Sequence, residues 1–157
     1  MKKPGENNNM YAEAKAHALE PYARAVEGSF DAAICVVFAD RLADEARAAL
    51  RAACEGIGFS EPSFLDAALL TEDNAEKDLF AAIEALDPLM LAVADAAAAA
   101  RLAAAYREPV AADAYGFVFG RPYAAFSSFQ RDLADPRMKQ RDWALLKAMR
   151  KSADWLG

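Results

Sequence analysis

The sequence predicts an α/β fold, a three-layer α/β/α sandwich around a small, mostly parallel sheet of four strands. The main observation is a pattern that occurs twice: an apolar run ends in an aspartate, and an alanine-rich helical stretch follows at once. The two runs are residues 32–39 before Asp40 and residues 89–94 before Asp95. A fully apolar run fits a strand buried on both faces, and such a strand followed directly by a helix is half of a βαβ unit.

Short apolar runs bounded by turn residues predict four strands in all. They are residues 32–39, 63–70, 89–94 and 115–119, the last followed by a turn at Gly120-Arg121-Pro122, after which a short extension through Ala125 is left open. Apolar residues at helical spacing, ended by glycine or proline, predict the helices between them. These are residues 10–27, 41–55, 75–86, 96–107 and 136–156, with one or two helical turns near 127–133. Strands and helices therefore alternate, and right-handed crossovers place helices on both faces of the sheet.

Two aspartate–proline pairs mark helix boundaries. Asp87-Pro88 ends the third helix, because the residue before a proline disfavours helical backbone. Asp135-Pro136 begins the last helix, with an aspartate at the N-cap and a proline in the first turn.

The composition is that of one globular domain. The chain has 157 residues, of which 55% are hydrophobic and 27% charged. We expect residues 1–9 to be a disordered leader and residues 10–157 to form a single α/β domain. The start lacks the apolar core of a signal peptide, and no apolar run reaches the roughly 18 residues that a membrane span needs. These features predict a cytoplasmic protein with no membrane partner, and they leave the oligomeric state open.

Cysteine and histidine are too few to suggest a metal site. Cys35 lies in the first apolar run and Cys54 on the helix after it, where free cysteines behave as small hydrophobic residues. His17 is the single histidine. We predict no disulfide, no metal ligands and no cofactor.

Candidate ligand-binding residues come from the rim formed by the carboxyl ends of the strands, where open α/β sheets bind ligands. Asp40 and Asp95 follow two strands there, and each either contacts a ligand or caps the next helix, the role that we favour. Arg121 is expected on the same rim beside Tyr123, placed to bind phosphate or carboxylate. The alternative for Arg121 is an ion pair with one of the aspartates that closes the rim.

No enzyme signature is present. The chain lacks Gly-x-Ser-x-Gly, a P-loop, Gly-x-Gly-x-x-Gly and His-Glu-x-x-His. No nucleophile with a neighbouring base is recognisable, so no catalytic residue is assigned and a non-catalytic protein is favoured.

Charge is unevenly distributed along the chain. The net charge is −6, yet residues 120–157 carry eight of the 18 basic side chains and only four of the 24 acidic ones. Aromatic residues interleave with these basic ones: Tyr123, Phe126, Phe129, Trp143 and Trp155. Such interleaving can mark a nucleic-acid surface, but a last helix with an aromatic inner face and a solvated basic outer face is favoured.

Residues 79–102 resemble the middle of uracil-DNA-glycosylase-like domains, in which a helix ends in a proline, a hydrophobic strand follows and a helix begins at a small residue. The closing strand, the turn at Arg121-Pro122 and the aromatic last helix resemble that family too. The resemblance implies the fold without the base-excision chemistry. Asp40-Arg-Leu-Ala-Asp44 stands where the family has a Gly/Pro-rich motif, Asp95 where it has a glycine, and residues 120–122 where it has a histidine.

The leading hypothesis is a non-catalytic domain that binds a small anionic or nucleotide-like ligand through Asp40, Asp95, Arg121 and Tyr123. The alternative is a protein-interaction or structural module with no small-molecule site, and an enzyme of unrecognised type ranks third. An open pocket at the strand ends with an unpaired Arg121 would favour the ligand hypothesis. A closed rim with an exposed apolar patch would favour the interaction module.

Overall fold

The computed structural model describes residues 4–70 and 74–154 and confirms the α/β fold, but its sheet has six strands, not four. The strand order is β1-β3-β2-β4-β6-β5. The strands are β1 (Val26–Glu27), β2 (Ile34–Phe38), β3 (Ser63–Asp66), β4 (Met90–Val93), β5 (Ala114–Val118) and β6 (Arg121–Ala125). The central strands β3, β2, β4 and β6 are parallel, whereas β1 and β5 run antiparallel at the two edges.

The two additional strands lie where the sequence predicts the end of a helix and a turn. β1 lies at the end of the expected helix 10–27. The expected fourth strand, 115–119, corresponds to the edge strand β5, and the fourth parallel strand is β6, in which Arg121 pairs with Val118. Phe119 and Gly120 both have positive φ, at 50° and 79°, as the tight hairpin turn between β5 and β6 requires. The strict alternation of strands and helices is therefore wrong at this point.

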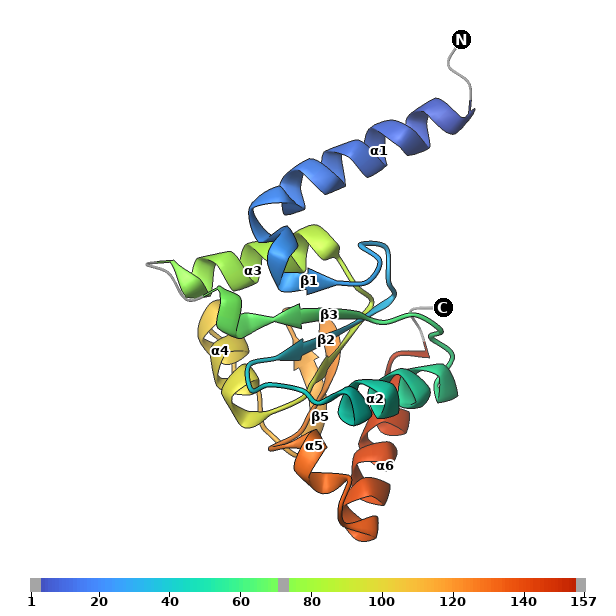
Figure 1. Ribbon diagram of the computed structural model, residues 1–157, viewed down its shortest axis with the longest axis vertical. Coiled ribbons are helices and arrows are strands. Elements are labelled where there is room, and N and C mark those ends of the chain that lie inside the picture. Colours follow the sequence, from blue (N-terminus) through green and yellow to red (C-terminus); the bar gives the residue numbers. More distant parts are fainter. Residues whose placement is uncertain (1–3, 71–73, 155–157) are drawn as a thin grey trace.

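Helices cover both faces of the sheet (Figure 1). Because side chains alternate along a strand, Cys35 and Val37 pack on one face while Ile34 and Val36 pack on the other. The first face is covered by α3 (Ala75–Leu86) and α4 (Ala96–Tyr106). The second is covered by α2 (Asp44–Gly56), α5 (Phe129–Asp132) and α6 (Pro136–Ser152).

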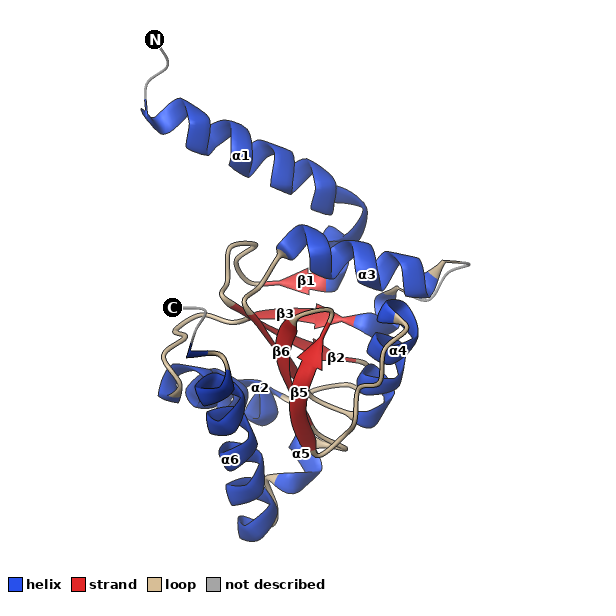
Figure 2. Ribbon diagram, turned by 180° about the vertical axis from the view of Figure 1, so that it is seen from behind, coloured by secondary structure: helices blue, strands red, loops and turns tan. Residues whose placement is uncertain are grey.

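The first helix, α1 (Pro4–Leu19), extends away from the rest of the molecule (Figures 1 and 2). Of the leader expected at 1–9, residues 1–3 lie outside the described residues, and residues 4–9 form the first turns of α1. A 3₁₀ segment, η1 (Glu20–Ala25), leads into β1, and η2 (Ala67–Leu69) follows β3. Throughout the described part of the chain, no helix combines the length and apolarity that crossing a bilayer would require.

Candidate functional site

Asp95 joins the carboxyl ends of β2 and β4. Its side chain is buried, with 3% of the residue's surface exposed. One carboxylate oxygen, Oδ1, accepts a hydrogen bond from the Ala98 amide at 2.8 Å, which confirms Asp95 as the N-cap of α4. The other, Oδ2, accepts from the amides of Ala39 at 2.9 Å and Asp40 at 3.0 Å. The carboxylate therefore connects the loop after β2 to the first turn of α4 and closes the rim between β2 and β4. The strand order of the sheet reverses between these two strands.

Asp40 does not cap a helix, contrary to our preferred interpretation. α2 begins only at Asp44, with Ala43 at the N-cap position and no side chain capping it. The intervening loop is held differently: the Ala43 amide donates to the Gln130 side-chain oxygen at 2.6 Å, which ties the loop to α5. Asp40 is exposed on this loop. It lies beside Asp95 as expected, but its own amide is what Asp95 binds.

Arg121 lies at the opposite end of the sheet, so its expected place beside the two aspartates is wrong. It begins β6, alongside the start of the parallel strand β4. Its guanidinium donates to Glu84 at 2.6 Å, to the Pro88 carbonyl at 2.8 Å and to Asp87 at 3.1 Å. Burial disfavours the charge, but the hydrogen bond and negative charge of Glu84 outweigh that effect and raise the pKa of Arg121. Arg121 thus forms structural ion pairs with Glu84 and Asp87, which join β6 to the end of α3.

Tyr123 is buried on the face of the sheet covered by α3 and α4. Its hydroxyl accepts a hydrogen bond from the Ala111 amide at 3.3 Å. A side chain at Gly116 of β5 would meet this hydroxyl, since a Cβ there would lie 3.1 Å from it. Of the four predicted binding residues, only Asp40 and Asp95 are brought together.

A cluster of acidic residues near the end of β6 was missed by sequence reasoning. Asp113, Asp132 and Asp142 each place a carboxylate oxygen within 4.8 Å of the others. Arg141 lies among them, its Nη2 donating at 2.9 Å, 3.1 Å and 3.3 Å respectively. Ser127 donates to Asp113 through its hydroxyl at 2.6 Å and its amide at 3.0 Å. The three aspartates come from a loop and two different helices, and no local pattern connects them.

Three carboxylates this close could hold a cation, but the guanidinium of Arg141 already lies between them. The arrangement supplies one positive charge for three carboxyl groups. Asp142 Oδ2 is buried and has no hydrogen-bond partner in the described residues. Burial, then the hydrogen bond and charge of Asp132, raise the pKa of Asp142 to about 8. Asp113 differs: hydrogen bonds from Ser127 and the charge of Arg141 outweigh its burial and lower its pKa.

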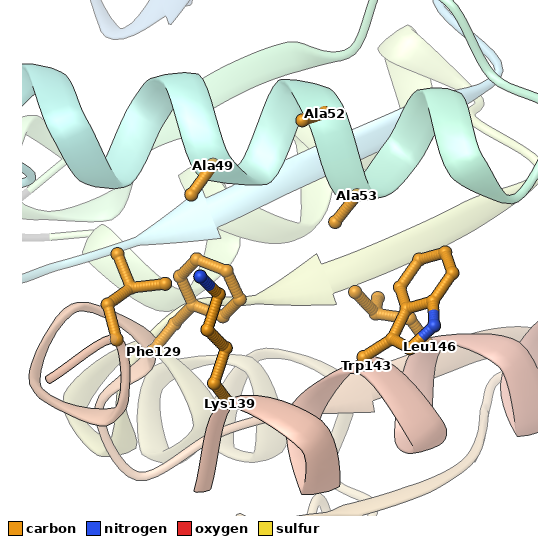
Figure 3. A pocket seen from close by; sticks show the side chains of 8 residues that line it. Ala49, Ala52, Ala53, Phe129, Lys139, Trp143 and Leu146 are labelled. Carbon is orange, nitrogen blue, oxygen red and sulfur yellow. The ribbon is translucent and has the colours of Figure 1, made fainter. Parts of the chain in front are cut away.

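An apolar cleft lies between α2 and the α5–α6 segment (Figure 3). Its volume is about 330 Å³. The lining side chains are those of Ala49, Ala52, Ala53, Phe129, Leu133, Lys139, Trp143 and Leu146. Seven of these eight are apolar, and the eighth, Lys139, extends from α6 toward α2 with its amine at the cleft (Figure 3). This amine has no salt-bridge partner among residues 4–70 and 74–154.

Trp143 forms one end of the cleft and packs closely against α2. A Cβ placed on Gly56 would lie 2.5 Å from the indole ring, so the glycine allows this approach. The Lys147 amine lies 5.3 Å from the centre of the Trp143 ring, at cation–π distance. The alanines of α2 thus line one side of the cleft, and the Trp143 side chain lies at one end of it (Figure 3).

Most aromatic residues of the basic C-terminal segment face inward. Tyr123, Phe126 and Phe129 are buried, and Trp143 is half-buried in the cleft. Trp155 lies outside the described residues. The four that are described are consequently not arranged as an exposed stacking surface for bases.

Both cysteines are free and buried, as the sequence predicted. Burial raises the pKa of Cys35 to about 11 and that of Cys54 to about 12. Neither thiol is therefore prepared to act as a nucleophile at neutral pH.

Comparison with known proteins adds no family to this geometry. Neither the protein-family models nor the curated proteins contain a match to the chain. The resemblance to uracil-DNA-glycosylase-like domains therefore stays a prediction.

Proposed function

We propose that this protein is a non-catalytic, cytoplasmic binding domain whose ligand is a small carboxylate with an apolar tail, held in the cleft between α2 and α6. The observation that carries the proposal is an apolar cleft with one amine, that of Lys139, which has no salt-bridge partner in the part of the chain that the structure describes. Small-molecule sites are commonly concave, mostly apolar and equipped with a few polar groups that orient the ligand. The proposal keeps the anionic ligand expected from the sequence but moves its site away from the rim, because Asp95 and Arg121 are engaged elsewhere.

The positive charge of Lys139 and the apolar lining of the cleft favour this ligand chemistry. An ammonium group beside an apolar wall attracts an anion, while the alanines of α2 and the rings of Phe129 and Trp143 can take up hydrocarbon. Burying a methylene group contributes about 0.8 kcal/mol, so two further methylenes should tighten binding by roughly tenfold. The gain should stop once the tail fills the cleft.

The test uses the fluorescence of Trp143 in a Trp155→Phe background, which leaves Trp143 as the single indole of a chain that has two. Straight-chain carboxylates of six, eight and ten carbons are the probes, with octanol and octylamine as neutral and cationic controls. We expect octanoate to bind more tightly than either control, and affinity to rise with chain length. Adenosine monophosphate tests the nucleotide-like ligand of the sequence hypothesis.

Matched variants separate the two parts of the site. Lys139→Gln should weaken octanoate about five- to tenfold and leave octanol unchanged, whereas Lys151→Gln on an exposed part of α6 should leave the binding of both probes unchanged. Ala49→Leu should fill the cleft and weaken every tailed probe, whereas Ala48→Leu on the exposed side of α2 should not. Equal binding of octanoate and octylamine, or binding insensitive to Ala49→Leu, would contradict the proposal. So would binding of the nucleotide alone.

The edge strand β5 favours a second candidate function, self-association. Tyr115 and Phe117 are 47% and 44% exposed, and no charged residue lies within Ala114–Val118 to discourage pairing of the edge. Antiparallel pairing of two copies about Gly116 would set Tyr115 opposite Phe117 of the second copy. Sedimentation or light scattering should then show a dimer that Phe117→Lys dissociates, and a monomer at all concentrations would exclude it.

A further inference from the structure

Two buried carboxyl groups lie close together where α5 and α6 meet. Asp132 ends α5, and Asp142 lies in α6; they are 4% and 1% exposed. Their oxygens belong to the set that lies within 4.8 Å of one another. Two carboxylates at this distance repel each other strongly when both are ionised and out of water.

The groups that face this pair do not balance its charge. α6 contributes Arg141, α5 contributes Arg131 at its exposed side, and the segment before β5 contributes a third carboxylate, Asp113. Beyond β6, Ser127 offers its hydroxyl to Asp113. Arg141 contacts all three carboxylates, and Arg131 acts only at longer range on Asp113.

Asp142 Oδ2 is the atom on which a proton could offset the excess negative charge. It is buried without a partner in the described residues, although a buried acceptor is almost always hydrogen-bonded. A proton on this oxygen would turn it into a donor toward Asp132. It would also reduce the negative charge of the cluster by one unit.

We propose that Asp132 and Asp142 share one proton, and that its loss loosens the junction of α5 with α6. The raised pKa of Asp142, about 8, agrees with a proton held at neutral pH and released just above it. The arrangement is a pH-sensitive latch built from a carboxylic acid and a carboxylate.

The two aspartates are close in the chain to residues that line the cleft. Phe129 lies three residues before Asp132 and Leu133 directly after it, and Trp143 follows Asp142. Lys139, three residues before Asp142, is one helical turn away. Loosening the junction would therefore displace several side chains that line the cleft. If the proposed function holds, ligand affinity falls over the pH range in which the proton leaves.

The test needs no ligand. In the Trp155→Phe background, Trp143 emission is followed from pH 6.5 to 9.3, and we expect one transition near pH 8. Asp142→Asn should abolish the transition, because its amide can donate to Asp132 as the protonated acid does and cannot ionise. Asp154→Asn, which changes an exposed carboxylate two residues beyond α6, should leave it unchanged.

Other outcomes overturn the proposal. A flat emission profile in the parent protein does so, as does the same transition in Asp142→Asn. A melting temperature that rises with Mn²⁺ or Ca²⁺ in the parent but not in Asp142→Asn would assign the cluster to a cation instead. Octanoate titrations at pH 6.5 and 9 complete the design: absence of binding at both pH values contradicts the proposed function, while the ligand-free transition still decides the latch.

Discussion

Replacing Asp95 by alanine removes a single carboxylate that accepts hydrogen bonds from three backbone amides. Two of these, from Ala39 and Asp40, belong to the loop after β2, and the third, from Ala98, belongs to the first turn of α4. The residue is 3% exposed, so solvent cannot replace the lost acceptor without opening the rim.

The expected cost follows from these contacts. Losing an N-cap side chain destabilises a protein by about 1 kcal/mol. Leaving a buried amide without an acceptor costs about 1–3 kcal/mol, and the two amides that face Oδ2 are partly buried, so each should cost an amount near the lower end of that range. Asp95→Ala should therefore lower the free energy of unfolding by about 3–4 kcal/mol. The exposed cap Asp135 has a side chain that accepts one hydrogen bond in the described residues, from the Arg137 amide, and its change to alanine should cost about 1 kcal/mol.

Urea denaturation gives the free energies, and hydrogen exchange locates the effect. Asp95→Ser should recover only the cap, because its hydroxyl reaches one amide in place of three. The amide of residue 98 should then keep its protection from exchange, while those of residues 39 and 40 lose theirs. If Asp95→Ala costs no more than Asp135→Ala, or if residues 39 and 40 stay protected in it, the closure of the rim by this carboxylate is refuted.

Three further predictions concern other buried groups. Arg121→Met should destabilise the fold by about 2–4 kcal/mol in urea denaturation, because it leaves the half-buried carboxylate of Glu84 without its cationic partner and with the Tyr106 hydroxyl as its remaining donor in the described residues; an unchanged midpoint would contradict this. Cys35 and Cys54 should resist iodoacetamide in the native protein and react once it is unfolded, as mass spectrometry would show. The pKa of Asp142 rises from 3.8 to about 8 on folding, so its contribution to stability is present at low pH and is lost as pH rises through that interval. Urea midpoints should therefore fall less steeply with pH in Asp142→Asn, and identical slopes would argue against it.

The position of Arg121 shows where local patterns stop being informative. The apolar run 115–119 looks like one more strand of a βαβ series, and the following glycine and proline look like its closing turn. In the structure, Phe119 and Gly120 take positive φ values and reverse the chain into β6. Because the sequence pattern does not predict this hairpin, it places Arg121 after the carboxyl end of a parallel strand. The residue in fact lies at the start of β6, at the opposite end of the sheet.

The cleft and the cluster of acidic residues could not be predicted from the sequence for a related reason. Alanines on α2 and an aromatic residue on α6 are ordinary helix residues until the two helices are seen side by side (Figure 3). Asp113, Asp132 and Asp142 lie in a loop and two helices, and only packing brings their carboxylates together. The raised pKa of Asp142 is likewise a property of its burial beside Asp132 and not of its neighbours in the chain.

The sequence by itself determined the α/β class, the helix at 75–86, the start of the next at residue 96, and the caps at Asp95 and Asp135. These features depend on contacts between residues a few positions apart, and the chain displays such contacts directly. Tertiary structure alone decided the six-stranded sheet and the two hydrogen bonds that Asp95 accepts from the loop after β2. It also decided the ion pair of Arg121 with Glu84 and the cleft at Lys139. Strand order and buried charge depend on which distant segments meet, and that is settled by burying every apolar face at once.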